Sequence, residues 1–192
     1  MFSLKKEDDI NEEEKLKQEL VKKSQISILL NNYNDIFSDF DPRPYNTRAL
    51  SDDFLLEAKK AARDKEENLQ LDFLIKKSER KLEHEILIKR RLREHFKKHA
   101  VLAQEEVSKV KKEGYILIGI GVLMMFITVL IYSNIISFGE FTKSIIIIIT
   151  EPAGWFLFWI GGEKLVYEKK EKMPDLDFYK KMSIVEIVFH SY

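Results

Sequence analysis

Glu151 is the residue of this sequence whose type and position are most able to do chemistry, because it is an acid inside a long apolar stretch. An ionisable group within a membrane span is costly, and it usually pairs, becomes protonated or lines a polar path. Glu151 lies about eight residues into the stretch, a depth of roughly 12 Å, opposite Thr128 or Tyr132 of the preceding apolar stretch. The neighbouring Pro152 predicts a kink. An acid near a helix start, protonated or hydrogen-bonded to the neighbouring helix, is the favoured interpretation, and a polar path in an assembly of several copies stays open.

His95 and His99 are the second candidate, because they stand four residues apart in a segment with helical spacing and such a pair can bind a metal. No cysteine, further histidine or paired acid completes the ligand set, so ordinary helix surface is the favoured interpretation. The sequence also lacks a glycine-rich phosphate loop, a Gly-x-Ser-x-Gly motif and a His-Glu-x-x-His motif. The absence of cysteine excludes thiolate chemistry and suits a reducing compartment. We expect no cofactor, no metal and no catalytic residue.

The third candidate is a strap of residues 31–50, rich in Asn, Asp, Pro and aromatic residues. Pro42 and Pro44 favour an extended chain, so the strap is expected to cross a surface. Its aromatic residues Phe37, Phe40 and Tyr45 are expected to pin it there. Turn and cap chemistry explains its acids, although a membrane-tethered enzyme that uses them is one hypothesis. The residues proposed for interaction are Phe40, Asp41, Arg43, Tyr45 and Arg48.

A basic cluster precedes the apolar part of the chain. Residues 76–112 carry 13 Lys or Arg against 6 Asp or Glu, although the whole chain has a formal net charge of zero. A solvated helix face is the favoured interpretation, contact with anionic lipid comes next, and nucleic acid is an unlikely partner because no aromatic platform accompanies the cluster. The candidate lipid-binding residues are Lys89, Arg90, Arg91, Arg93, Lys97 and Lys98.

The elements that must position these residues are dominated by two predicted membrane spans, residues 115–136 and 144–162. The first has 22 residues without a charge, enough to cross a hydrocarbon layer of ~30 Å. The turn between the spans, residues 137–143, is too short for an external domain. Lysines lie before the first span and after the second, and only Lys143 lies in the turn. We therefore expect a two-span protein of the cell membrane with both termini in the cytoplasm.

The remaining pattern predicts a small cytoplasmic α+β element. Residues 69–75 and 184–189 carry apolar residues at every second position, as half-buried strands do, and we expect them to pair. A helix over 51–64 is expected to begin with Ser51 as cap, and a long pre-membrane helix is expected from residue 78. Residues 26–30 fit either a helix end or a strand. The predicted segments are 1–35, charged and partly helical or disordered; 36–113, the cytoplasmic strap, helix, strand and long helix; 114–163, the transmembrane hairpin; and 164–192, a cytoplasmic tail with a strand.

Two motifs carry a resemblance. The first is Phe40-Asp41-Pro42-Arg43-Pro44-Tyr45, followed by Arg48, and the second lies at the exit of the second span, with Trp155, Trp159, Glu163 and Tyr167. Together they resemble a group of small bacterial and archaeal membrane proteins with two transmembrane helices. Where that group tends to have an Arg-Pro step after the second Trp, this chain has Ile160-Gly161. The resemblance implies the architecture and no activity.

The sequence as a whole thus predicts a mainly α-helical membrane protein built on a two-helix transmembrane hairpin. The favoured function is a non-enzymatic, membrane-anchored interaction or assembly subunit that acts through its cytoplasmic face. Its expected partners are the lipid bilayer and either another protein or further copies of itself. The competing hypothesis is a homo-oligomeric pore or membrane-perturbing effector that uses Glu151, and the membrane-tethered enzyme comes third.

Overall fold

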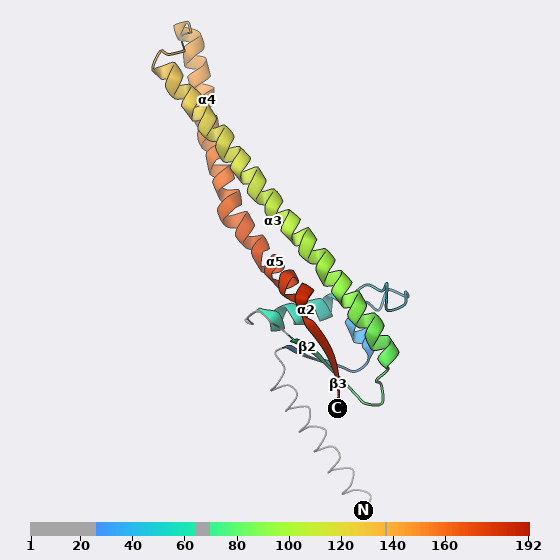
Figure 1. Cartoon of the computed structure of the whole chain (residues 1–192). Helices are drawn as coiled ribbons and strands as arrows, with labels where there is room; N and C mark the ends of the chain where they lie inside the picture. Colours follow the sequence, from blue (N-terminus) through green and yellow to red (C-terminus); the bar gives the residue numbers. More distant parts are fainter. Residues whose placement is uncertain (1–25, 64–69, 137) are drawn as a thin grey trace, which may run out of the picture. The chain divides into compact units, whose positions relative to one another are not determined.

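The computed structural model describes residues 26–63, 70–136 and 138–192, and it is mostly helical with one small sheet (Figure 1). The predicted charged helix within residues 1–25 lies outside the described residues. The strands are β1 (Ile26–Leu30), β2 (Gln70–Ile75) and β3 (Glu186–Ser191). The helices are the 3-10 helix η1 (Tyr33–Ile36), α2 (Asp52–Ala62), α3 (Leu82–Tyr132), α4 (Glu140–Glu163), the π-helical turn η2 (Lys164–Glu168) and α5 (Lys169–Ile184).

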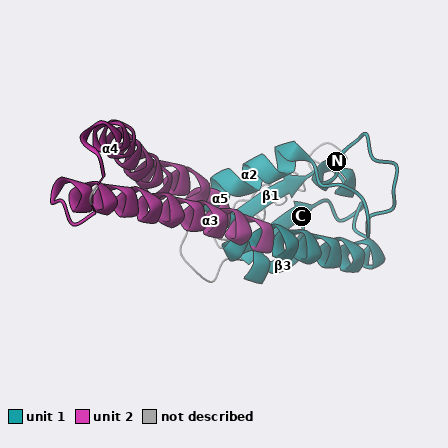
Figure 2. Ribbon diagram, turned by 90° about the horizontal axis from the view of Figure 1, so that it is seen from above, with its two compact units in different colours: residues 1–100, 177–192 teal, residues 101–176 magenta. Residues whose placement is uncertain are grey.

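The chain divides into two compact units, which Figure 2 colours separately. The sheet unit comprises the described residues of 1–100 and 177–192, and the hairpin unit comprises those of 101–176. The two units meet between residues 100 and 101 and between residues 176 and 177, whereas the predicted segments end at residues 35, 113 and 163. The reason at residue 35 is that β1 and η1 belong to the sheet unit, and the other two boundaries fall inside the run of α3 and at the end of α4.

The sheet is entirely parallel, in the order β1-β2-β3. The predicted pairing of residues 69–75 with the C-terminal strand is confirmed, with Phe73 opposite Phe189. Phe73 also stands opposite Ile28, so the undecided segment 26–30 forms a third strand. Parallel pairing requires each connection to return to the starting edge of the sheet. The connection from β2 to β3 does so by running out along α3 and back through α4, η2 and α5.

One face of this sheet packs into the core of the sheet unit. In the central strand β2, Leu71, Phe73 and Ile75 all point to that face, and Phe73 stacks on Phe189 with 5.0 Å between ring centroids. Helix α2 lies over β1 and supplies Phe54, whose ring is 5.9 Å from that of Phe73. The first turns of α3 and the last turns of α5 close the core with Ile88, Leu92, Phe96, Phe178 and Met182.

Helix α3 is continuous over 51 residues, so the predicted pre-membrane helix and the first predicted span form one element. On the return, the helical path from Glu140 continues without a break to Ile184, where the sequence predicted only a tail before the last strand. Both helical stretches are long and apolar enough to cross a membrane. A seven-residue loop, 133–139, joins them, and Lys143 closes it by donating a 2.7 Å hydrogen bond to the Asn134 side chain.

Glycines set how closely α3 and α4 approach within the hairpin unit. A Cβ atom on Gly121 would lie 2.7 Å from the carbonyl oxygen of Gly154, and one on Gly161 would lie 2.7 Å from the carbonyl oxygen of Gly114. Gly114 and Gly121 are seven residues apart in α3, and Gly154 and Gly161 are seven residues apart in α4. Seven residues are close to two helical turns. By contrast, Gly119 has nothing within 4 Å of its added Cβ. The hairpin is therefore held by backbone-to-backbone contact at two levels.

Candidate functional site

The strap is a closed loop in the sheet unit. Phe37 and Leu50 form an isolated antiparallel bridge, and the Ser38 amide donates to the Ala49 carbonyl oxygen at 3.0 Å. Helix α2 follows at once, with Ser51 in the cap position but with no hydrogen bond from its side chain to the helix. Residues 38–49 are thus held at their base between η1 and α2.

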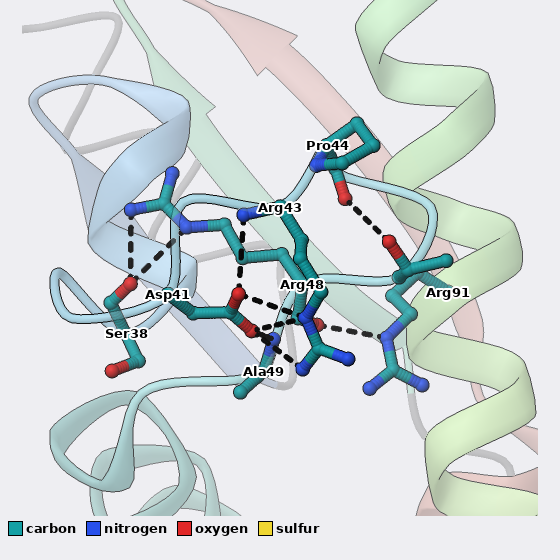
Figure 3. Close-up of polar contacts among 8 residues, drawn as sticks. Ser38, Asp41, Arg43, Pro44, Arg48, Ala49 and Arg91 are labelled. Atoms are coloured by element: carbon teal, nitrogen blue, oxygen red, sulfur yellow. Dashed lines mark hydrogen bonds and ion pairs between the residues drawn. The ribbon is translucent and has the colours of Figure 1, made fainter.

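Asp41 is the centre of this loop (Figure 3). Its carboxylate accepts hydrogen bonds from the Arg43 guanidinium at 2.7 and 2.8 Å, and from the Ala49 amide at 2.6 Å. The hydrogen bonds from the Arg43 side chain, followed by the one from the Ala49 amide, hold the pKa of Asp41 well below its usual range. Because the carboxylate is engaged across the loop, it acts as a brace.

Arg48 supplies the second brace. Its guanidinium donates to the Ser38 carbonyl oxygen at 2.9 and 3.1 Å, and to the Asn34 side-chain oxygen at 2.8 Å. Its own carbonyl oxygen accepts a 2.9 Å hydrogen bond from Arg91 of α3. Arg91, predicted to belong to the lipid-binding face, is therefore engaged with the strap (Figure 3).

The aromatic residues of the strap have unequal roles. Phe37 is buried and Tyr45 stacks on it at 5.1 Å, so these two pin the strap as predicted. The prediction is wrong for Phe40, whose side chain is 98% exposed. Phe40 lies in the turn that the Asp41 amide closes by donating to the Ser38 carbonyl oxygen. A side chain in such a turn points away from the loop that the turn closes.

A buried polar cluster joins η1 to the start of α3, and no local sequence pattern predicts it. Glu85 is 1% exposed and accepts a 2.7 Å hydrogen bond from Arg80 and a 3.3 Å hydrogen bond from the Tyr33 hydroxyl. The Lys81 amide donates to the same hydroxyl at 2.9 Å. Burial, and secondarily the charge of Glu85, raises the pKa of Tyr33.

A second buried acid, Asp72, lies on the central strand, on the face opposite the core cluster. Asp72 is 2% exposed. Its Oδ1 accepts a 2.8 Å hydrogen bond from the side-chain amide of Gln70 and lies 3.0 Å from the Nε2 atom of His190. Ser27 stands beside Asp72 in the register of β1 and β2. Asp72 therefore lies between the serine and histidine strands, whereas nucleophilic catalysis needs the histidine between serine and acid.

His95 and His99 do lie close together, with ring centroids 4.1 Å apart. Tyr179 of α5 stacks on His99 at 5.2 Å, and the Nε2 atom of His95 is buried without a hydrogen-bond partner in the described part of the chain. Burial, followed by the charges of His99, Arg91 and Lys98, lowers the pKa of His95 to about 4. Among the described residues, no group of three or more His, Cys, Asp or Glu could hold a metal ion.

Of the rest of the basic cluster, Lys89, Arg90, Arg93 and Lys97 lie along one face of α3. It borders a shallow hollow of about 360 Å³, and Arg90 donates a 2.9 Å hydrogen bond to Glu94 within it. Lys89 lies 5.6 Å from the centroid of the Phe189 ring. Lys97 and Lys98 are exposed. The residues that line the hollow are Ile86, Lys89, Arg90, Arg93, Glu94 and Lys97.

In the hairpin unit, the polar contact between α3 and α4 joins Thr128 to Thr150, whose hydroxyl oxygens are 2.8 Å apart. This corrects the prediction that Glu151 faces Thr128 or Tyr132. Glu151 is exposed, and Tyr132 is 57% exposed. One residue along a helix turns the side chain by ~100°, which is enough to move it off the contact. The four exit residues also face outward: Trp155, Trp159, Glu163 and Tyr167.

Ion pairs join the two helical stretches beyond the predicted spans. Lys164 donates to Glu113 at 3.1 Å and to Glu168 at 3.0 Å, and Lys172 donates to Glu106 at 3.0 Å. The hydrogen bonds from Lys164 lower the pKa of Glu113. These pairs extend the contact of α3 with the helical path after α4 into a polar segment.

No protein-family model, no curated protein and no solved structure matches this chain. The resemblance suggested by the strap and by the exit of the second span therefore stays a prediction. The candidate site comprises the strap, a braced loop that exposes one aromatic side chain, and the hairpin unit, whose exterior is apolar.

Proposed function

We propose that this chain is a membrane-anchored interaction or assembly subunit without enzymatic activity, whose sheet unit binds another protein on the cytoplasmic side of the cell membrane. The observation that carries the proposal is the exposure of Phe40, at 98%, on a loop held by Asp41 and Arg48. The anchor is a second element of the proposal, and it has separate support.

Support for the anchor comes from the exterior of the hairpin unit. Only 22% and 11% of the most apolar stretches of the two long helices are buried, whereas the core helix of a soluble protein is mostly buried. Ile148, Phe156 and Trp159 are 70%, 68% and 67% exposed. Soluble proteins rarely expose an apolar surface that extends over two helices, whereas a hydrocarbon layer stabilises such a surface.

Support for the orientation comes from charge. Lys109, Lys111 and Lys112 precede the first apolar stretch, Lys164, Lys169, Lys170 and Lys172 follow the second, and Lys143 is the sole lysine of the turn. Lysines near the ends of spans stay on the cytoplasmic side. The ion pairs of Lys164 and Lys172 fit a polar phase directly outside the hydrocarbon layer. Both termini, and with them the strap, would then lie in the cytoplasm.

Support for a protein partner comes from the physics of an exposed, preordered aromatic side chain. A phenylalanine can bury 150–250 Å² of surface, on the scale of aromatic side chains in interfaces. Binding through Phe40 orders little further chain, because Asp41, Arg43 and Arg48 already fix the loop. A side chain that projects from a turn fits an apolar pocket on the partner. Arg43 lies beside it with 59% of its side chain exposed and can contact the rim.

The test is site-specific photocrosslinking in intact cells. A photoreactive amino acid replaces Phe40 in the full chain, and in a matched control it replaces Leu56, which is 51% exposed on α2 of the same unit. We expect a discrete crosslinked product from position 40 and none from position 56. Separately, Phe40→Ala should reduce recovery of the same partner at least tenfold while leaving the thermal unfolding midpoint unchanged.

Two results would contradict the proposal at different points. Equal crosslinking from both positions, or none from position 40 in chains recovered with the membrane, would remove the strap as the interaction surface. Recovery of the chain in the soluble fraction after alkaline extraction would remove the anchor. Orientation is checked with a cysteine introduced at Gly139, which is exposed in the turn and should react with a membrane-impermeant maleimide from outside the cell.

A further inference from the structure

We infer that the hairpin pairs with a second copy of this chain, through the face of α4 that carries Ile148, Glu151 and Trp155. The inference rests on the proposed membrane insertion and deepens the proposed assembly role. The observation behind it is an acid, Glu151, that is exposed on the outside of the hairpin within its apolar part. Glu151 is exposed between Ile148 and Trp155, which are 70% and 52% exposed.

The depth of Glu151 makes this exposure costly. It lies seven residues after Ser144 and eleven before Gly162 in the predicted span. At a rise of ~1.5 Å per residue it is therefore ~10 Å from one end and ~16 Å from the other, close to the middle of the layer. A glutamate side chain is too short to reach the interface from there. Ionisable groups at this depth are nearly always turned toward protein.

The hairpin itself offers Glu151 no partner. Glu151 makes no hydrogen bond or ion pair with another residue in the described part of the chain. Thr128 and Thr150, the polar side chains at the contact of α3 with α4, lie within hydrogen-bond distance of each other and of carbonyl oxygens of their own helices, so these three contacts already engage their two hydroxyl hydrogens. Neither predicted span contains Lys, Arg or His. In the described part of the chain, no side chain of the hairpin therefore satisfies the carboxyl group, and a second chain can do so.

A backbone acceptor adds to the need on the same face. Pro152 lies inside α4 and has no N–H, so the carbonyl oxygen of Ile148, four residues earlier, lacks its usual helical donor. An acceptor without a donor in hydrocarbon is costly. The face thus presents one carboxyl group, and one carbonyl oxygen without its usual helical donor, within a single helical turn.

A second copy of the chain can satisfy both groups, because symmetry brings like to like. In a two-fold pair with the axis along the membrane normal, equivalent residues lie at the same depth. Glu151 of one copy then meets Glu151 and the Ile148 carbonyl oxygen of the other, and a protonated carboxyl group can donate to either oxygen. A different protein would need a polar group of its own at this depth, whereas a second copy carries Glu151 there.

The test uses the absence of cysteine from the chain. Single cysteines are introduced at Ile148, on the proposed contact, and at Ile149, which is exposed on another side of α4, and the full chain is oxidised in native membranes. We expect a disulfide-linked dimer from Ile148→Cys and at least tenfold less from Ile149→Cys. Adding Glu151→Leu to Ile148→Cys should lower the association constant by about threefold to thirtyfold, the range of interhelical hydrogen bonds in membranes. Adding Glu151→Gln should preserve pairing, because an amide also bonds across the contact.

Each alternative result overturns a defined part. Equal or absent crosslinking from the two cysteines, in chains that resist alkaline extraction, would refute the pairing and leave the proposed anchor intact. An Ile148→Cys adduct whose mass shows a different protein would refute the second copy as the occupant. Unchanged pairing in Glu151→Leu would refute the role of the carboxyl group. Loss of the chain from the membrane fraction would instead refute the proposed function itself.

Discussion

Gly121 provides the sharpest test of how the hairpin is held. A Cβ atom at this position would lie 2.7 Å from the Gly154 carbonyl oxygen and 2.8 Å from the Phe158 amide nitrogen. Both are backbone atoms of α4, so no side chain can rotate to relieve the contact. Gly121→Ala therefore forces the two helices apart, whereas Gly119→Ala on the same helix meets nothing within 4 Å.

The size of the effect follows from these distances. Ordinary van der Waals contact begins at 3.4 Å, so the helices must separate locally by about 0.7 Å. Separation loosens packing along the contact and lengthens the bond between Thr128 and Thr150, which is 2.8 Å long. Overpacking of this kind costs about 1–3 kcal/mol. Gly119→Ala should change the stability of the hairpin by less than about 0.5 kcal/mol, the range of surface substitutions away from special features.

The assay follows separation of the helices in the full chain. Cysteines at the exposed Lys112 and Lys170 carry a fluorescent donor and acceptor, and sodium dodecyl sulfate is titrated into a mild-detergent solution. Gly121→Ala should lose energy transfer at a lower mole fraction of sodium dodecyl sulfate than the parent, and Gly119→Ala should follow the parent. Gly154→Ala, whose nearest neighbour is the flexible Met125 side chain at 3.0 Å, should fall between them.

The reasoning fails if Gly121→Ala and Gly119→Ala shift the titration equally, or if neither does. A further check is the combination of Gly121→Ala with Gly154→Ala. The two substitutions strain the same contact, so once the first has separated the helices the second should cost less than it does alone. Additive costs would mean that the two glycines do not share an interface.

Two predictions concern the sheet unit. Glu85→Ala should lower the free energy of unfolding by about 1–3 kcal/mol, because Arg80 and the Tyr33 hydroxyl lose their buried acceptor; chemical denaturation measures this, and a loss below about 0.5 kcal/mol would contradict it. His95 has a pKa lowered to about 4, so between pH 6.5 and 4 the unfolded chain binds more protons and stability falls as the pH falls. The loss from pH 7 to 5 should be about 1 kcal/mol after allowance for partial exposure, and His95→Phe should flatten the dependence; an unchanged slope would count against it.

Helices α2, α3 and α4 and strands β2 and β3 could be predicted because their patterns are local. Residues 69–75 have an apolar residue at every second position, and the first apolar stretch is too long and uniform for a buried helix of a soluble protein. Whether residues 26–30 form a helix end or a strand could not be decided, because five residues with one serine fit both the helical and the strand periodicity. Helix α5 was missed because its charged start and Pro174 resemble a tail. Packing of Phe178 and Met182 into the core overrides that local preference.

The strap could be located from composition, but the roles of its residues could not. Which aromatic side chain is buried depends on the bridge between Phe37 and Leu50, which joins positions thirteen residues apart. Arg91 is basic and lies among basic neighbours, so its hydrogen bond to the Arg48 carbonyl oxygen has no local signature. The same holds for Glu85, because its partner Tyr33 is 52 residues away.

Glu151 shows most clearly what a hydropathy pattern leaves undetermined. Its depth follows from counting residues at ~1.5 Å each, so the sequence correctly predicts an acid inside the apolar stretch. Its direction depends on which side of α4 faces α3, and Gly154 and Gly161 mark that side, because a Cβ atom added at either glycine would lie within 3.2 Å of α3. Thr150 falls on the contact and Glu151, ~100° further round, falls outside it. The same acid thus changes from a group predicted to be satisfied within one hairpin to the group on which the proposed pairing of two chains rests.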